Sequence, residues 1–366
     1  MNFIFHLLLS QIRLNFFNST KSKLSLAVSG GQDSIILFFC FFILKKQCQY
    51  RLNSIYCNHL WQTSSLKCYL HLAKFQYTVL TTYFAIIVLN PVKTEHQARE
   101  WRFWLFERLS TFTAIKYYLL GHTASDNIET FLMNLIRGTG VTGLCSIVPD
   151  RFSYSPKFNC FSEKRINLKA LTYPIGWNEE YHLNHLVNPG LISIQRPLLS
   201  FNRYEIRVLL DTAHLPLWVD STNQNFCYMR NRIRYQILPM LRFYLNQKVD
   251  NCIGRCSEIL TGENIYLNNV TLTCLKTDLI VKQNSHVLIF NFSFFRSYPT
   301  IIQKRLLLVG LKFNNKFNVT FALIHKLLKT LAIFQEARFQ YPQPIKLSDQ
   351  LIFILYKDKL ILLSPQ

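Results

Sequence analysis

The chain has 366 residues, enough for two or three domains with sizeable cores, and 49% of the residues are hydrophobic. This composition excludes an intrinsically disordered protein, and the longest apolar run, residues 35–44, is too short to cross a bilayer. Lys and Arg number 41 against 20 Asp and Glu, which gives a formal net charge of +21. We therefore expect an acidic polymer, above all nucleic acid, as the partner, and no membrane.

The ten cysteines are scattered without a Cys-x-x-Cys pair, which argues against a zinc or iron–sulfur site. With no convincing export signal, this usage indicates reduced thiols in a reducing compartment. Many Phe, Ile, Asn and Lys and few Gly indicate an AT-rich coding genome, such as that of an organelle. We expect a plastid stroma (chloroplast), with a bacterial cytoplasm as the alternative.

The first part of the chain is predicted to form an α/β fold with a doubly wound parallel sheet. An opening helix leads into alternating segments, with strands predicted at residues 24–28, 52–57, 77–84 and 117–121. Helices are predicted after the first three of these strands. Ligands bind at the carboxyl ends of the strands in such a sheet, so we expect the chemistry in the segments that follow them.

A glycine turn joins the first strand to its helix. Adjacent glycines let backbone N–H groups approach an anion, and the new helix directs its positive end to the same point. A carboxylate beside phosphate needs a cation between them, so Asp33 is predicted to lie against Mg²⁺. The alternative is an ordinary glycine turn with a serine helix cap. The turn consists of Ser29, Gly30, Gly31, Gln32, Asp33 and Ser34.

Two further segments are candidates for ligand contacts. His59 follows the second strand, although a lone histidine is more often structural. The helix predicted over residues 95–110 carries Glu95, Arg99 and Arg102 on one face. Two tryptophans on this helix leave little polar surface, so an arginine face aimed at phosphate competes evenly with a solvated Glu95–Arg99 ion pair.

Paired carboxylates open the helix after the fourth strand. Gly121 and His122 follow that strand, and Asp126 and Glu129 lie three residues apart on one side of the helix. Such a pair can bind an ammonium group or a metal and then take a proton from an attacking amine. A capping box with Asp126 as N-cap is the structural alternative, and both roles can coexist.

A basic loop and an irregular stretch come next. Arg137 opens a glycine-rich loop, residues 137–143, whose alternative is a plain helix stop. The periodicity fades from about residue 147 to 194, and we interpret this stretch as a long surface insertion. Regular patterning resumes with Arg196 and a helix predicted over residues 203–213.

A helical linker and a small basic α+β domain are predicted for the rest of the chain. The linker carries three arginines in five residues, which fit an RNA backbone and a solvated helix face equally well. These are Arg230, Arg232 and Arg234. Beyond residue 245 we predict two helices and a final hairpin, at residues 300–311, 320–331, 351–356 and 360–363.

Together these motifs resemble the tRNA(Ile)-lysidine synthetases and stand in the same order over residues 20–240. The glycine turn by itself resembles the pyrophosphate (PP) loop of the N-type ATP pyrophosphatases, and it lacks the lysine of loops that serve γ-phosphate transfer. The resemblance implies an adenine nucleotide alpha hydrolase-like fold. It implies a PP-loop catalytic domain at residues 20–218, and a linker with a C-terminal tRNA-binding domain at residues 219–366.

The resemblance also implies a two-step reaction on the wobble cytidine of a tRNA(Ile) with a CAU anticodon. ATP, with Mg²⁺, would adenylate the oxygen at ring carbon 2, and the ε-amine of free lysine would then displace AMP to give lysidine. The catalytic residues would be Asp33, Arg99, Asp126 and Glu129, with Arg99 neutralising charge at the adenylated oxygen. The glycine turn, His59, Gly121 and His122 would bind ATP. The tRNA-binding residues would be Arg137, Arg196, Arg230, Arg232 and Arg234.

One segment departs from the family pattern, and two other functions stay open. The family's His-Val-Asn-His-Gly-like segment here runs from Tyr56 to Leu60, which keeps His59 but lacks the first histidine and the glycine. The first alternative is sulfur insertion into a tRNA base, which generally needs a cysteine pair, and the chain has no Cys-x-x-Cys. The second alternative is a non-catalytic RNA-binding protein on the same fold, which would not need the carboxylates of Asp33, Asp126 and Glu129. The oligomeric state is left open, with a homodimer among the alternatives.

Overall fold

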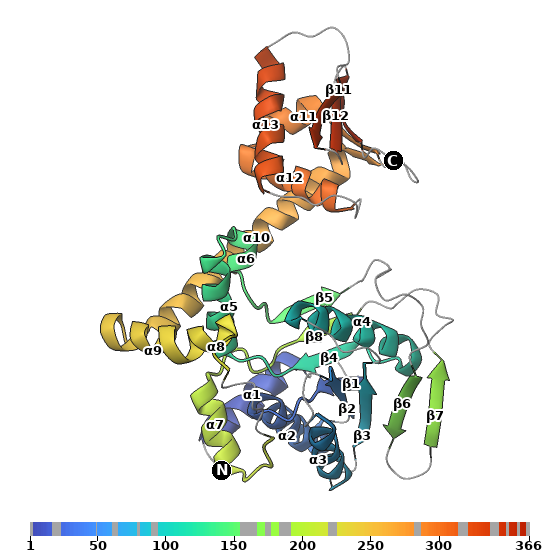
Figure 1. Ribbon diagram of the computed structural model, residues 1–366, viewed down its shortest axis with the longest axis vertical. Coiled ribbons are helices and arrows are strands. Elements are labelled where there is room, and N and C mark those ends of the chain that lie inside the picture. The colour runs from blue at the N-terminus through green and yellow to red at the C-terminus, as the bar shows by residue number, and fades with distance from the viewer. Residues whose placement is uncertain are drawn as a thin grey trace. The chain divides into compact units, whose positions relative to one another are not determined.

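The computed structural model divides into two compact units, Met1–Glu258 and Ile259–Gln366, which are treated separately (Figure 1). The division falls later in the chain than the boundary predicted at residue 218. The structure describes residues 3–16, 23–48, 50–60, 65–78, 81–88, 94–153, 167–172, 177–182, 192–218, 225–281, 287–313, 321–336, 344–348, 351–356 and 359–363.

A six-stranded sheet forms the centre of the first unit, in the order β3-β2-β1-β4-β8-β5. The first five strands of this order run parallel, and β5 pairs antiparallel with β8 at the edge. This confirms the predicted doubly wound parallel sheet. The strands are β1 Lys23–Ala27, β2 Arg51–Asn58, β3 Thr82–Ile87, β4 Tyr117–Leu120, β5 Asp150–Ser153 and β8 Ile192–Gln195.

Helices cover both faces of this sheet (Figure 1). The helix after β1, α2, is apolar on all sides because it packs between the sheet and other helices, and Ile35 to Phe38 are fully buried. The helices that share its core are α1 Phe3–Phe16, α2 Gln32–Gln47, α3 Ser65–Thr78 and α7 Arg203–Thr212. The other face packs against α4 Glu95–Thr113.

A group of helices outside the sheet, which we call the helical arm, forms a small core of its own around Ile128, Ile233 and Leu238. Two of its segments, η3 and η4, are π-helical turns, which continue the short helices α8 and α9. The arm comprises α5 Ala124–Ile136, α6 Val141–Leu144, α8 Met229–Arg232, η3 Ile233–Ile237, α9 Leu238–Met240, η4 Leu241–Leu245 and the start of α10 Val249–Asp278.

Two sequence predictions for this unit are corrected by the structure. Tyr77 belongs to the end of α3, and β3 begins at Thr82, because the aromatic and β-branched residues there continue the helix. The supposed insertion at residues 147–194 contains β5 and most of β8, in which Ile192 and Ile194 are buried. Each of these strands has only four residues. The stretch also holds a two-stranded sheet, β6 Asn167–Thr172 with β7 Trp177–His182.

The second unit is an antiparallel sheet packed with helices, as predicted for a small α+β domain. The two predicted helices and both strands of the final hairpin are present, and the turn at residues 357–358 lies outside the described residues. The elements are β9 Leu279–Val281, β10 Val287–Asn291, α11 Phe292–Ser297, α12 Thr300–Phe313, α13 Phe321–Glu336, β11 Pro344–Ser348, β12 Leu351–Tyr356 and β13 Lys359–Leu363. Across the described part of the chain, every helix is too short or too polar to cross a membrane.

Gly121 fixes the contact between β4 and the glycine turn. A Cβ at Gly121 would lie 3.0 Å from the backbone of Asp33 and Ser34, which cannot yield without moving the first turn of α2. We expect Gly121→Ala to lower the free energy of unfolding in urea by about 1–3 kcal/mol. Gly254→Ala is the control, because its Cβ would meet nothing within 4 Å inside α10 and should leave stability equal or higher. Equal stability of both variants would contradict this role.

Candidate active site

The glycine turn closes around one hydroxyl group. Gly30 has a left-handed backbone, φ 86°, and Gly31 is the N-cap of α2. The Oγ of Ser34 accepts a hydrogen bond from the Ser29 N–H at 3.1 Å and donates one to the Gly31 carbonyl at 2.9 Å. The predicted order of strand, turn and helix is confirmed, and the start of α2 presents free N–H groups at this turn.

Asp33 lies on the first turn of α2, with 18% of its side chain exposed. Its Oδ1 accepts from the Gln32 amide at 3.1 Å, and its Oδ2 accepts from Arg203 at 3.4 Å. Burial raises the pKa of Asp33, and the Arg203 guanidinium partly opposes this rise. A buried carboxylate of this kind is stabilised by a nearby cation, as the predicted magnesium contact requires.

Asp126 has two roles, one for each oxygen. Thr123 is the N-cap of α5, and Asp126 is the third helical residue of the capping box, so the box predicted with Asp126 as N-cap begins one turn earlier. The Oδ2 accepts from the Thr123 N–H at 2.9 Å and from its hydroxyl at 3.1 Å. The Oδ1 turns to arginines. The cap therefore leaves one oxygen of Asp126 for other partners, and its catalytic role stays a prediction.

Three guanidinium groups surround Asp126 and Glu129. Arg230 donates to Asp126 at 2.9 Å and to Glu129 at 2.8 Å, and Arg234 donates twice to Glu129, at 2.7 and 2.8 Å. Arg203 donates to Asp126 at 3.1 Å and to Glu129 at 3.4 Å. We call these five side chains, together with Asp33, the carboxylate–arginine centre.

The arginines determine the charge state of this centre. Burial would raise the pKa of Asp126, but Arg230, Arg203 and the Thr123 N–H together lower it below the usual value. Burial likewise disfavours the charged form of Arg230, yet Asp126 and Glu129 raise its pKa. Glu129 is only 1% exposed. A carboxyl group so deeply buried is costly without hydrogen-bonding partners of this kind.

The structure gives two predicted tRNA-binding arginines partners that the sequence analysis did not predict. Arg230 and Arg234 bind the carboxylates, so their contact with tRNA stays a prediction. Arg196 is buried, and its guanidinium donates to the Val148 carbonyl. Arg137 and Arg232 are exposed. Arg203 was not among the predicted site residues, because in the sequence this arginine looks like an ordinary first residue of a helix.

The two arginines of α4 differ in placement. Arg99 is exposed and lies over the Phe103 ring, 5.4 Å from its centroid, so its catalytic role stays a prediction. Arg102 is half-buried and lowers the pKa of both His59 and His122. It therefore points toward the sheet edge. Glu95 lies 3.7 Å from Arg230, a partner other than the Arg99 weighed from the sequence.

His59 and His122 are held neutral at the same edge. Burial, and then Arg102, lower the pKa of His59 to about 4, and burial lowers that of His122 to about 3. Leu60 stands where the family has glycine and adopts a left-handed backbone, φ 56°. The Asn58 side chain accepts from the Leu60 N–H at 3.0 Å and supports this turn.

Buried polar atoms at this edge fit a nucleotide. The Nδ2 of Asn58, the Nε of Arg102 and the Nδ1 of His122 are buried without a hydrogen-bond partner among the described residues. Buried polar atoms normally have partners, so a ligand with polar atoms would satisfy them. Asp33 and the turn serines supply the oxygen ligands that Mg²⁺ prefers. The residues present therefore suit both ATP and Mg²⁺.

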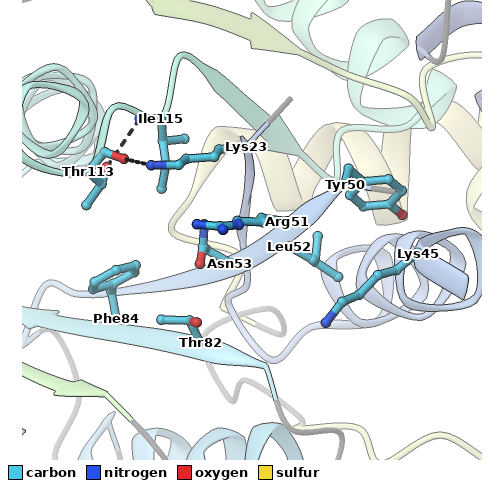
Figure 2. A pocket seen from close by; sticks show the side chains of 10 residues that line it. All are labelled: Lys23, Lys45, Tyr50, Arg51, Leu52, Asn53, Thr82, Phe84, Thr113 and Ile115. Carbon is cyan, nitrogen blue, oxygen red and sulfur yellow. Dashed lines mark hydrogen bonds between the residues drawn. The ribbon is translucent and has the colours of Figure 1, made fainter. Parts of the chain in front are cut away.

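A hollow of about 300 Å³ lies elsewhere, where the parallel strands begin (Figure 2). It is lined by Lys23, Lys45, Arg51 and seven other residues, which come from the amino ends of β1, β2 and β3, the last turn of α2, the end of α4 and the segment before β4. Lys23 donates to the Thr113 carbonyl at 3.1 Å. None of the predicted site residues lines this hollow, so the candidate chemistry lies at the carboxyl edge instead.

Comparisons with known proteins agree with this geometry. Residues 7–241 match the family described as the PP-loop domain. A chloroplastic tRNA(Ile)-lysidine synthase from Zygnema circumcarinatum is 30% identical over 342 residues, which cover 90% of this chain and 80% of that protein. A tRNA(Ile)-lysidine synthase from Nostoc sp. is 30% identical over 70% of this chain and 65% of its own length.

Solved structures support the fold. A U34-tRNA thiolase from Methanococcus maripaludis superposes with a TM-score of 0.52 at 14% identity, covering 71% of this chain and 79% of its own. At this identity the likeness shows the fold alone. The sequence match to the Zygnema circumcarinatum protein covers more of this chain and has a higher identity. The chain therefore belongs to the PP-loop family and, within it, to the tRNA(Ile)-lysidine synthases.

Proposed function

We propose that this protein joins lysine to ring carbon 2 of the wobble cytidine in the CAU anticodon of tRNA(Ile), at the expense of ATP. One observation carries the proposal. A phosphate-binding turn and a buried pair of carboxylates meet at one sheet edge, where Arg203 contacts both. The turn suits activation by ATP, and the carboxylates suit a cationic amine. Membership of the family supports this pairing of substrates.

In the first step, the base oxygen attacks the α-phosphate of ATP, the bond between the α- and β-phosphates breaks, and pyrophosphate leaves. The turn N–H groups and the hydroxyls of Ser29 and Ser34 would hold the phosphates. Mg²⁺, which Asp33 would hold, supplies charge neutralisation for the leaving pyrophosphate. His59 and His122, both neutral, would contact the nucleoside. Arg99 would neutralise the charge that develops at the adenylated oxygen of the bound tRNA.

In the second step, the bound ε-ammonium group of lysine first loses a proton. The neutral amine then attacks carbon 2, the carbon–oxygen bond to AMP breaks, and the nitrogen loses a second proton. Asp126 and Glu129 would bind the ammonium group and accept its first proton, and the second would pass to solvent. One oxygen of Asp126 is committed to the helix cap, and both oxygens of Glu129 accept hydrogen bonds from arginines, so an amine would reach either carboxylate only in place of a guanidinium group. Their burial excludes water that would otherwise compete with the amine.

The tRNA would lie along exposed basic side chains near this edge. Arg137 and Arg232 are exposed and belong to the helical arm that also carries Glu129 and Arg230. An anticodon loop is single-stranded, so a base can be splayed out of it into a pocket. The chloroplastic relatives support a plastid stroma as the location.

Nucleoside mass spectrometry tests this function. We expect tRNA(Ile) incubated with the protein, ATP, Mg²⁺ and lysine to gain the mass of lysine minus water on one cytidine. Omission of ATP or of lysine should abolish the gain. A sulfur-for-oxygen gain with a sulfur donor would instead identify a thiolase, and unmodified tRNA that still binds would identify a binding protein.

Asp33→Asn tests the magnesium contact. We expect this variant to lose tRNA-dependent pyrophosphate release by at least a factor of about 100, because a neutral amide holds the cation poorly. Binding of tRNA should survive, as judged by filter binding. Asp211→Asn is the control, because Asp211 is exposed and pairs only locally with Arg207. Full pyrophosphate release by Asp33→Asn would exclude the assignment.

Glu129→Gln tests the amine side. We expect lysine transfer to slow by a factor of about 100 or more, the usual contribution of a general base, while pyrophosphate release changes much less. Both rates would be measured by rapid quench on the same tRNA. Glu95→Gln is the matched control, because Glu95 also faces Arg230 but is largely exposed. An equal loss of both steps in Glu129→Gln would contradict the role.

A further inference from the structure

Arg203 joins the two halves of the site. One of its terminal nitrogens lies 3.4 Å from the Oδ2 of Asp33 and 3.1 Å from the Oδ1 of Asp126. The other lies 3.4 Å from the Oε1 of Glu129. Among the residues that the structure describes, it is the one cation paired with all three carboxylates. It therefore contacts both the glycine turn, through Asp33, and the carboxylate pair of α5.

Three guanidinium groups already face the three carboxylates of the carboxylate–arginine centre, and the largely exposed Glu95 lies 3.7 Å from one of them, Arg230. An incoming lysine ammonium would add a fourth cation beside Asp126 and Glu129. Like charges at such short range and low dielectric repel strongly. Lysine can bind there only if one guanidinium leaves.

Arg203 is the most easily displaced of the three. Its shortest contact with a carboxylate is 3.1 Å, against 2.8 Å for Arg230 and 2.7 Å for Arg234. Each of the other two also makes two close contacts, whereas Arg203 divides its contacts among three acids. Longer, divided hydrogen bonds are weaker. Lysine would therefore replace Arg203 first.

The side chain of Arg203 can move while its backbone stays fixed. Its N–H donates to the Ser125 Oγ at 3.1 Å, and the preceding Asn202 forms a capping box with Glu205. Its contact with Asp33 places the guanidinium next to the phosphate-binding turn. A guanidinium group can donate two hydrogen bonds to the oxygens of one phosphate. A bound triphosphate would therefore compete with the carboxylates for the Arg203 side chain.

We propose that Arg203 is a positioning residue that makes lysine binding depend on ATP. Without nucleotide its guanidinium occupies Asp126 and Glu129, and the phosphates of ATP draw it toward the turn, which opens the carboxylates to the ε-ammonium group. Lysine then binds after ATP. This inference rests on the proposed function, because it takes lysine as the amine and ATP as the nucleotide.

Lysine binding to the full chain tests the inference without any turnover. Equilibrium dialysis with labelled lysine would be run with Mg²⁺, with and without α,β-methylene-ATP, which cannot release pyrophosphate. We expect the analogue to tighten lysine binding at least tenfold in the wild type. Arg203→Gln should bind lysine tightly in both conditions, and Arg203→Lys should show a reduced dependence.

A matched control and a product assay separate the outcomes. Arg207→Gln, on the same helix but exposed and paired with Asp211, should keep the wild-type dependence. Equal lysine affinity with and without the analogue in a wild type that makes lysidine would overturn the inference and leave the function standing. If the wild type neither binds lysine in any condition nor makes lysidine, the function and the inference both fail. An Arg203→Lys variant that folds and keeps the full tenfold dependence would also overturn the inference.

Discussion

The site depends on one interaction, the burial of Glu129 and Asp126 against arginines. Two carboxylates placed inside a protein are costly unless cations and hydrogen bonds accompany them. Here the cations come from α7, α8 and η3, and the carboxylates from α5, so the interaction fastens the helical arm to the sheet edge. Removing all of the arginines would leave buried charges unpaired. The same pairing thus holds the elements together and concentrates negative charge where we propose that the amine binds.

The chemistry follows from where this centre lies. The glycine turn and α5 both begin at the carboxyl ends of adjacent parallel strands, β1 and β4, which brings phosphates and carboxylates to one edge. Gly121 lets the end of β4 pack against the first turn of α2 without a side chain between them. The activating half and the amine half are therefore neighbours because of the sheet order, and Arg203 spans the step between them.

The sequence was informative where chemistry is local. Ser29 to Ser34 join a strand to a helix within a few residues, and Asp126 and Glu129 share one helix, so local spacing predicted both arrangements. Arg203 was missed because its contacts with Glu129 and Asp33 span 74 and 170 residues. Arg230 and Arg234 were noticed, but the direction in which they point depends on how α8 and η3 pack on α5 within the helical arm. Strand β8 is only four residues long and follows a stretch without regular patterning, so it was not recognised as a strand.

The central claim is that ATP activates the base of tRNA, and that the amine enters only afterwards. Exchange of labelled pyrophosphate into ATP reports which substrate is adenylated, because the exchange requires a reversible adenylate. The account predicts exchange with tRNA(Ile) in the absence of lysine, and loss of exchange when lysine consumes the adenylate. Exchange supported by lysine without tRNA would show that the amino acid is activated instead, and would contradict the account.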